Sequence, residues 1–265
     1  MPSAAAALVD VRHVPFWLDG PEPEPTAALV GATTTDLAVV GGGYSGLWTA
    51  LLAKERAPER DVVLLESHTA GWAASGRNGG FCAASLTHGL GNGLARFPAE
   101  MTTLARLGRE NLDAIEQTVV DQGIDCSFER TGELSVATAD WQVSELAEVP
   151  ALAAQVGENV ELLDRDQVRA LVNSPTYLGG VLDRDGVAML DPARLARGLR
   201  DACLRAGVRI HENTPVEGLS DRGAGVTLRT SYGEVLAARV ALATKPFRRC
   251  CVGWRPTSCR SGTTC

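Results

Sequence analysis

Apolar and polar positions in the first third of the chain follow two patterns that predict a strand–helix–strand unit. Short continuous apolar runs at 36–40 and 61–66 predict buried strands, since both faces of such a strand lie against other elements. Between them, residues 44–57 carry Leu47 and Ala50 at helical spacing, as a helix packed on a sheet requires. A strand, a glycine-rich turn, a helix and a second strand within about 30 residues form a βαβ unit.

The rest of the chain shows the same two kinds of element. The helix at 191–208 has the clearest boundaries, with Asp191 at the N-cap, Pro192 at the first helical position and Gly207 at the end. Residues 1–35 are Pro-rich and irregular, and 67–100 are loop-like. Further helices are expected at 99–123, at 141–157 apart from Pro150, and at 166–172, and strands at 132–137, 160–164, 209–213, 225–231 and 235–244.

Composition excludes several classes of protein. Apolar residues make up 45% of the 265 positions and charged residues 22%, which is ordinary for a globular protein. The net charge is −7 and the basic residues are scattered, so neither nucleic acid nor an anionic membrane is expected as a partner. No apolar run approaches the roughly 18 residues of a membrane span. The first residues lack the basic segment of a secretion signal, and we therefore expect a cytoplasmic protein.

The seven cysteines fall into two groups. Cys82, Cys126 and Cys203 stand singly, without the spacing of metal ligands, and are expected to be small buried hydrophobic side chains. No metal site is expected. The other four mark a break in composition within the last 16 residues, at Cys250, Cys251, Cys259 and Cys265.

A glycine-rich turn between the first strand and the first helix points to a dinucleotide. Gly41, Gly43 and Gly46 have the spacing G-x-G-x-x-G. The first glycine makes a tight turn, the second lets backbone approach a pyrophosphate, and the third lets the helix pack closely on the strand. An ordinary glycine-rich turn is the alternative, but the flanking strand and helix favour a dinucleotide site.

Glu66 ends the second strand, 20 positions after the last of these glycines. At the tip of that strand a carboxylate can accept hydrogen bonds from ribose hydroxyls, and it would repel a 2′-phosphate. This position argues against an NADP site. The alternative is a solvent-facing glutamate at a strand end.

A second small-residue segment, at 74–80 (ASGRNGG), favours a flavin over a nicotinamide. Its backbone can approach a flat ligand, Arg77 can offset phosphate charge, and Asn78 offers both donors and acceptors. A simple nicotinamide dehydrogenase would instead continue from Glu66 into another crossover helix. A flexible surface loop is the alternative.

These motifs, in this order, resemble those of the FAD-dependent oxidoreductases of the D-amino-acid oxidase superfamily. The similarity is greatest to the branch of gamma-glutamylputrescine oxidase and glycine oxidase-like amine oxidases, and it extends from about Phe16 to Thr244. The resemblance implies that Gly41, Gly43, Ser45 and Gly46 line the FAD pyrophosphate and that Glu66 holds the adenosine ribose.

The resemblance also implies roles for later segments. Residues 207–219 look like the second strand pair of the FAD domain, where the backbone of Val216 meets the adenine. Residues 240–244 look like the turn under the dinucleotide that ends at Thr244, and Lys245 is the first departure from the pattern. The residues that run along the pyrophosphate toward the isoalloxazine are Ser75, Gly76, Arg77, Asn78, Gly79 and Gly80.

No catalytic residue can be assigned from the sequence. His88 follows the flavin loop and is a candidate to face the active site, with a surface or structural role as the alternative. An acid–base residue is not obligatory, because flavin oxidation of an amine transfers hydride to the cofactor while the protein supplies position and electrostatics.

The expected fold is therefore α/β, with a Rossmann-like FAD-binding domain and an inserted mixed α+β substrate region. The expected divisions are an N-terminal arm at 1–35, the FAD-binding βαβ unit and flavin loop at 36–85, the inserted region at 86–185, the return to the FAD domain at 186–245 and an aberrant tail at 246–265.

The expected function is FAD-dependent oxidation of an amine or amino acid, acting on a CH–NH group. Hydride passes to FAD and then to O₂, giving an imine (then an aldehyde or keto acid), hydrogen peroxide and ammonia or an amine. A catalytically inactive FAD-binding fragment is the first alternative. A nicotinamide-dependent dehydrogenase is the second, and no second G-x-G-x-x-G motif supports it.

The tail from Lys245 onward has no periodicity and does not fit the family, which continues beyond this point. We hypothesise that it is translated out of frame and that the C-terminal part of the FAD domain is missing. The alternative is a genuine short protein with a reactive or disulfide-forming tail, which a reducing compartment disfavours.

Overall fold

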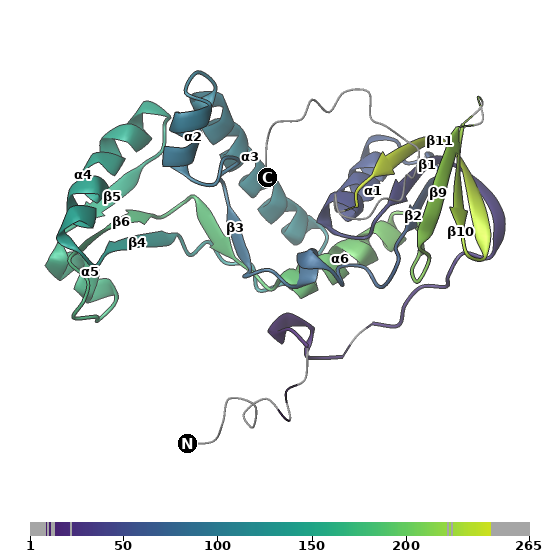
Figure 1. Ribbon diagram of the computed structural model, residues 1–265, viewed down its shortest axis with the longest axis horizontal. Coiled ribbons are helices and arrows are strands. Elements are labelled where there is room, and N and C mark those ends of the chain that lie inside the picture. Colours follow the sequence, from purple (N-terminus) through teal and green to yellow (C-terminus); the bar gives the residue numbers. More distant parts are fainter. Residues whose placement is uncertain are drawn as a thin grey trace. The chain divides into compact units, whose positions relative to one another are not determined.

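The computed structural model describes residues 9, 11, 14–21, 23–221, 223 and 225–244, so the predictions for the tail lie outside the described residues. The described residues form two compact units (Figure 1). The first unit combines residues up to Arg77 with those from Ala196 onward, and the second unit comprises Asn78–Leu195. From the sequence, we placed the boundaries of the inserted region at 86 and 185.

A six-stranded sheet with the order β8-β2-β1-β11-β10-β9 forms the first unit. The four strands from β8 to β11 are parallel, and β10 and β9 continue the sheet antiparallel. In chain order the parallel strands follow the 3-2-1-4 arrangement of dinucleotide-binding α/β domains. The strands are β1 (Gly31–Val40), β2 (Val62–Leu65), β8 (Arg209–His211), β9 (Val216–Asp221), β10 (Val226–Thr230) and β11 (Gly233–Leu242).

The reversal of strand order lies beside β1. The chain moves outward from β1 through β2 to β8, and later returns on the other side of β1 as β11. The carboxyl ends of β1 and β11 meet, where the N–H of Ala243 donates to the Val40 carbonyl at 2.9 Å. In open α/β sheets, ligands bind outside the carboxyl ends of the strands at such a switch point.

Two helices pack in this unit because their apolar positions recur at helical spacing. In α1 (Tyr44–Arg56), Leu47 and Ala50 are fully buried and the helix packs on β1, β2 and β11. The helix α6 (Pro192–Arg205) begins as predicted, since the Asp191 carboxylate accepts the N–H groups of Ala193 and Arg194. The strand β2 is buried at all four positions, as its continuous apolar run requires.

Two small antiparallel sheets and four helices form the second unit. One sheet pairs β3 (Phe81–Ala83) with β7 (Val187–Met189), and the other has the order β4-β6-β5. The helices α4 and α5 pack on this three-stranded sheet, around a core of Leu163, Val168 and Leu182. The remaining bounds are β4 (Glu133–Ala137), β5 (Val160–Leu163), β6 (Gly179–Asp183), α2 (Leu90–Arg96), α3 (Met101–Asp121), α4 (Asp140–Gln155) and α5 (Arg165–Leu171).

Several expectations from the sequence are wrong in detail. The first strand begins at Gly31, because it pairs with β11 from Gly31 to Val40, so 31–35 belong to the sheet and not to an arm. Residues 67–100 are not simply loop, because they contain the 3-10 turn η3 (Ala74–Gly76), β3 and α2. The helix α4 continues through Pro150, and its packing on all three strands of its sheet offsets the lost backbone hydrogen bond.

The predicted strand pair at 207–219 is also wrong. Its two strands, β8 and β9, lie at opposite edges of the six-stranded sheet, where β8 pairs with β2 and β9 with β10. The strand at 209–213 ends at His211, after which the chain turns through Asn213 in the left-handed region (φ 51°). Among the described residues, no helix has the length and apolar character needed to cross a bilayer.

Candidate dinucleotide-binding site

The site is built around the turn that leaves β1 at Gly41. Gly41 has a φ of 110°, and its N–H donates to the Leu65 carbonyl at 2.8 Å. A Cβ at Gly41 would lie 2.7 Å from the carbonyl oxygen of Ala243, just after β11. Both the backbone conformation and the space at the switch point therefore require glycine.

The first turn of α1 lies directly against this loop. A Cβ at Gly46 would lie 1.8 Å from the Gly41 carbonyl oxygen, so only glycine allows this approach. The first hydrogen bond of the helix runs from the Leu47 N–H to the Gly43 carbonyl at 2.9 Å. The N–H groups of Ser45 and Gly46 precede it, and they point with the positive end of the helix dipole toward the space where an anion would bind.

Glu66 follows β2 and its half-buried carboxylate is held in place from two sides. Its Oε2 accepts the N–H of Gly42 at 2.6 Å, and its Oε1 accepts the Ser67 hydroxyl and the His68 N–H, both at 2.9 Å. A carboxylate offers about four acceptor sites, so this one retains capacity for a ribose hydroxyl. The carboxylate therefore lies beside the glycine turn, in a fixed orientation.

Two further glycines complete the turn region, and neither was predicted from the sequence. A Cβ at Gly42 would lie 3.0 Å from Cβ of Glu66. Gly71 has a φ of 76°, its N–H donates to the Gly42 carbonyl at 2.9 Å, and its Cβ would lie 2.5 Å from Cβ of Ala196. The middle position of Gly42 in the G-G-G run at 41–43 was the available signal for it, whereas Gly71 depends on a contact with a distant helix.

The segment 74–80 begins in the first unit next to this turn. Ser75 accepts the N–H of Tyr44 at 3.0 Å, which ties the segment to the first residue of α1. A Cβ at Gly76 would lie 2.4 Å from the Gly71 carbonyl oxygen. These contacts bring Ser75 and Gly76 to the same turn as Gly41 and Gly43.

Arg77 takes part in an aromatic stack. Its guanidinium carbon lies 4.7 Å from the centre of the Trp72 ring, and its Nε donates to the Trp72 carbonyl at 2.6 Å. The ring of His68 also stacks on the Trp72 ring, with the two ring centroids 4.2 Å apart. Arg77 is therefore held by a cation–π contact. Sequence reasoning did not identify His68 or Trp72.

The last residues of the segment lie in the second unit. Asn78 accepts the N–H of Gly80 at 2.9 Å through Oδ1, and Gly80 has a φ of 81°. A Cβ at Gly79 would lie 3.2 Å from the Phe81 ring. The carbonyl of Gly80 accepts the N–H of Leu190 at 3.0 Å, which anchors the end of the loop beside β7.

The remaining candidates occupy separate positions. Val216 is the first residue of β9, and Thr244 is exposed just after β11 at the switch point. His88 is exposed in the second unit, with a φ of 58°. The structure describes no contact that gives His88 a chemical role, and it remains a candidate only.

The electrostatics of the isolated cysteines agree with a structural role for two of them. Burial raises the pKa of the Cys203 thiol to about 12 and that of Cys126 to about 11, so both are neutral at physiological pH. Cys82, by contrast, is only partly buried. In the described part of the chain, no group of three or more His, Cys, Asp or Glu side chains could hold a metal ion.

The arrangement fits the adenosine diphosphate part of a dinucleotide. Gly41 and Gly46 let the turn, the start of α1 and the end of β11 pack together with no Cβ between them. The start of α1 offers backbone N–H groups, and Glu66 lies beside them. The fold is that of dinucleotide-binding α/β domains, and the site has the glycine turn, helix start and carboxylate that such domains use.

Comparison with protein families identifies the family to which the chain belongs. Residues 36–252 match the family described as FAD dependent oxidoreductase (DAO), and the chain belongs to this family. Gamma-glutamylputrescine oxidoreductase of Escherichia coli (strain K12) is 35% identical over 223 residues, which are 83% of this chain and 51% of that protein. The 4-methylaminobutanoate oxidase (formaldehyde-forming) of Paenarthrobacter nicotinovorans is 34% identical over 77% of this chain and 24% of its own length.

The chain thus spans about half the length of the first relative and about a quarter of the second. Solved structures share the fold. Glycine oxidase from Geobacillus kaustophilus superposes with a TM-score of 0.65 at 22% identity, covering 80% of this chain and 55% of that one. L-amino acid deaminase from Proteus myxofaciens superposes with a TM-score of 0.69 at 19% identity, covering 86% of this chain and 49% of that one. The predicted α/β fold and family are confirmed.

Proposed function

We propose that this chain binds FAD through its adenosine diphosphate half and takes part in oxidising an amine or amino acid. The observation that carries the proposal is the position of Glu66, whose carboxylate is bonded to the Gly42 N–H beside the first turn of α1. A carboxylate there accepts ribose hydroxyls while the helix start receives the pyrophosphate.

Each residue of the site has a definite task in this proposal. Gly41 makes the turn out of β1, Gly43 lets the backbone approach the pyrophosphate, and Gly46 lets α1 pack closely on the turn. The N–H of Ser45 donates to the pyrophosphate. Glu66 orients the ribose. These groups are backbone amides and a fixed carboxylate, so they hold the ligand without a change in their own geometry.

The flavin loop and two later residues extend this site. Ser75, bonded to the Tyr44 N–H, positions the loop at the pyrophosphate, and Gly76–Gly80 continue toward the flavin ring. Arg77, held on Trp72, adds positive charge near the phosphates. Val216 meets the adenine through its backbone, and Thr244 lies beneath the dinucleotide.

The names of the relatives support an amine or amino acid as the substrate class. Their names describe enzymes acting on gamma-glutamylputrescine, 4-methylaminobutanoate and glycine, which share a CH–NH group. When bound, FAD would accept a hydride from the carbon of such a group while the nitrogen proton is lost to solvent, which leaves an imine for water to hydrolyse. The two electrons would then pass to an acceptor such as O₂. The chain's own residues fix the cofactor against that substrate.

The test has two stages. The purified chain is reconstituted with FAD, desalted and examined for the visible flavin absorbance. Amines and amino acids are then added without oxygen, and we expect one class to bleach that absorbance and to give peroxide when air is readmitted. Flavin absorbance without bleaching would instead support an FAD-binding chain without turnover, and a colourless protein would refute the proposal.

A further inference from the structure

A glutamate that sequence reasoning did not identify is the most buried charged side chain among the described residues of the first unit. Glu212 follows β8 and is only 1% exposed. Its carboxylate accepts the N–H of Ala70 at 2.7 Å, the N–H of Thr26 at 2.6 Å, and two N–H groups of Arg200 at 3.1 and 3.2 Å. Isolated buried charges are costly, so a site with this many donors is a built arrangement.

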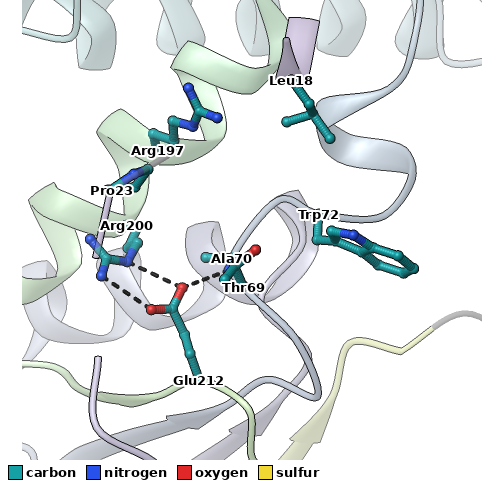
Figure 2. A pocket seen from close by; sticks show the side chains of 8 residues that line it. All are labelled: Leu18, Pro23, Thr69, Ala70, Trp72, Arg197, Arg200 and Glu212. Atoms are coloured by element: carbon teal, nitrogen blue, oxygen red, sulfur yellow. Dashed lines mark hydrogen bonds and ion pairs between the residues drawn. The ribbon is translucent and has the colours of Figure 1, made fainter. Parts of the chain in front are cut away.

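Figure 2 shows how these groups converge. Glu212 rises from the strand layer, Arg200 reaches down from α6, and Ala70 meets the carboxylate from the turn after Glu66. Burial by itself raises the pKa of the Glu212 carboxyl. The N–H groups of Ala70 and Thr26 and the Arg200 guanidinium outweigh it, so the pKa lies below its usual value. The pocket beside the pair is lined by Leu18, Pro23, Thr69, Ala70, Trp72, Arg197, Arg200 and Glu212.

On one side, Glu212 is connected to the dinucleotide site. Glu212 accepts the N–H of Ala70. The next residue, Gly71, donates its own N–H to the Gly42 carbonyl. The backbone around Glu212 also brackets Glu66. The Glu66 N–H donates to the His211 carbonyl at 2.9 Å, and the Thr214 N–H donates to the Glu66 carbonyl at 2.7 Å.

On the other side, Glu212 is connected to the segment before β1. Its Oε2 accepts the Thr26 N–H, and Arg200 Nη2 donates to the Glu24 carbonyl at 2.8 Å. The same stretch, 24–29, is bonded again at the Ala27 carbonyl by the His211 ring and at the Leu29 N–H by the Thr214 hydroxyl. Residues 24–29 are thus hydrogen-bonded to residues 211–214, the same stretch whose backbone is bonded to Glu66.

We propose that Glu212 is a positioning residue for the dinucleotide. Together with Arg200, Glu212 fastens residues 24–29 to the turn 67–71 and thereby sets the position of Glu66 and Gly42. This inference rests on the proposed binding of FAD. Glu212 does not touch the ligand in this account, and it acts through the Ala70 and Gly71 backbone.

The same unit contains an ion pair that serves as a matched control. Arg209 donates to Asp61, which stands before β2, at the opposite end of the strand from Glu66. Loss of that pair should affect the stability of the sheet but leave the turn 67–71 unchanged. A comparison of Glu212→Gln with Asp61→Asn therefore separates positioning of the site from a general loss of stability.

The experiment titrates the full-length wild type, Glu212→Gln and Asp61→Asn with FAD and, separately, with ADP, well below the melting temperature of each apo-protein. Glutamine keeps the shape, but its amide N–H₂ must face one of the N–H donors. We expect Glu212→Gln to lose about tenfold in affinity for both ligands, and Asp61→Asn to remain within about twofold of wild type. Hydrogen exchange without ligand should show faster exchange at Ala70 and Gly71 in Glu212→Gln alone.

Each possible outcome decides for or against the positioning role or the proposed function. Weaker FAD and ADP binding together with faster exchange at Ala70 and Gly71 supports the positioning role. A folded Glu212→Gln protein with wild-type affinity overturns it while the proposed function stands, as does an equal loss in Asp61→Asn. If Glu212→Gln does not fold, Thr26→Val, which removes only the hydroxyl bonded to Glu212, replaces it, and unchanged affinity there overturns the role. A wild type that binds neither ligand refutes the proposed function itself.

Discussion

Substitution of Gly46 by alanine tests the geometry of the glycine turn. The new Cβ would lie 1.8 Å from the Gly41 carbonyl oxygen, and real Cβ atoms essentially never lie closer than 3.0 Å to a neighbour. The start of α1 must therefore move away from the turn by about 1 Å, at a cost of about 1–3 kcal/mol for an overpacked contact. Alanine would recover up to about 1 kcal/mol through its higher helix propensity. The net expectation is a loss of about 1–2 kcal/mol.

The same displacement moves the Ser45 and Gly46 N–H groups, so FAD affinity should fall by about tenfold or more. Urea unfolding of the apo-protein measures the first effect and FAD titration the second. Gly91→Ala is the control, because Gly91 lies in α2 and no atom would come within 4 Å of its Cβ. It should be neutral or stabilising by up to about 1 kcal/mol. A Gly46→Ala protein with wild-type stability and FAD affinity would refute this reasoning.

Three further predictions each concern one carboxylate side chain. Glu66→Gln should weaken FAD binding by about tenfold, measured by fluorescence titration, because the amide cannot accept from Gly42, Ser67 and His68 together; unchanged affinity contradicts the ribose role. Asp191→Ala should cost about 1 kcal/mol in urea unfolding. Asp140→Ala should cost less than about 0.5 kcal/mol, because the side-chain bond at the start of α4 is made by Gln142, which accepts the Ala139 N–H. Because the folded-state pKa of Glu212 lies below its usual 4.5, its stabilisation is present above pH 4.5 and is lost as pH falls through the folded pKa. The unfolding free energies of wild type and Glu212→Gln should therefore converge in acid, and a constant gap would contradict the assignment.

The sequence alone was sufficient for the central βαβ unit. The strands β1 and β2 are buried at their carboxyl ends, so their apolar residues are continuous and distinct from the helical spacing of α1. The 20-residue interval between Gly46 and Glu66 placed the carboxylate at the strand end. Asp191 and Pro192 marked the start of α6 because capping is a local interaction.

Other features depend on contacts between distant residues, which a local pattern does not contain. The strands β3 and β7 have three residues each, too few for a period to be recognised, and they form by pairing with one another. Gly71 is required by its approach to Ala196 in α6. Glu212 looked like the end of an ordinary strand, whereas its partner Thr26 is 186 positions away in the sequence.

The most direct test of the account is equilibrium titration of the purified chain with FAD, followed by competition with ADP. The account predicts one FAD per chain, displaced by ADP, with affinity reduced in Gly46→Ala and Glu66→Gln and unchanged in Gly91→Ala. Absence of FAD binding by a folded wild-type chain, or binding that ADP does not displace and that neither site variant weakens, would contradict the central claim.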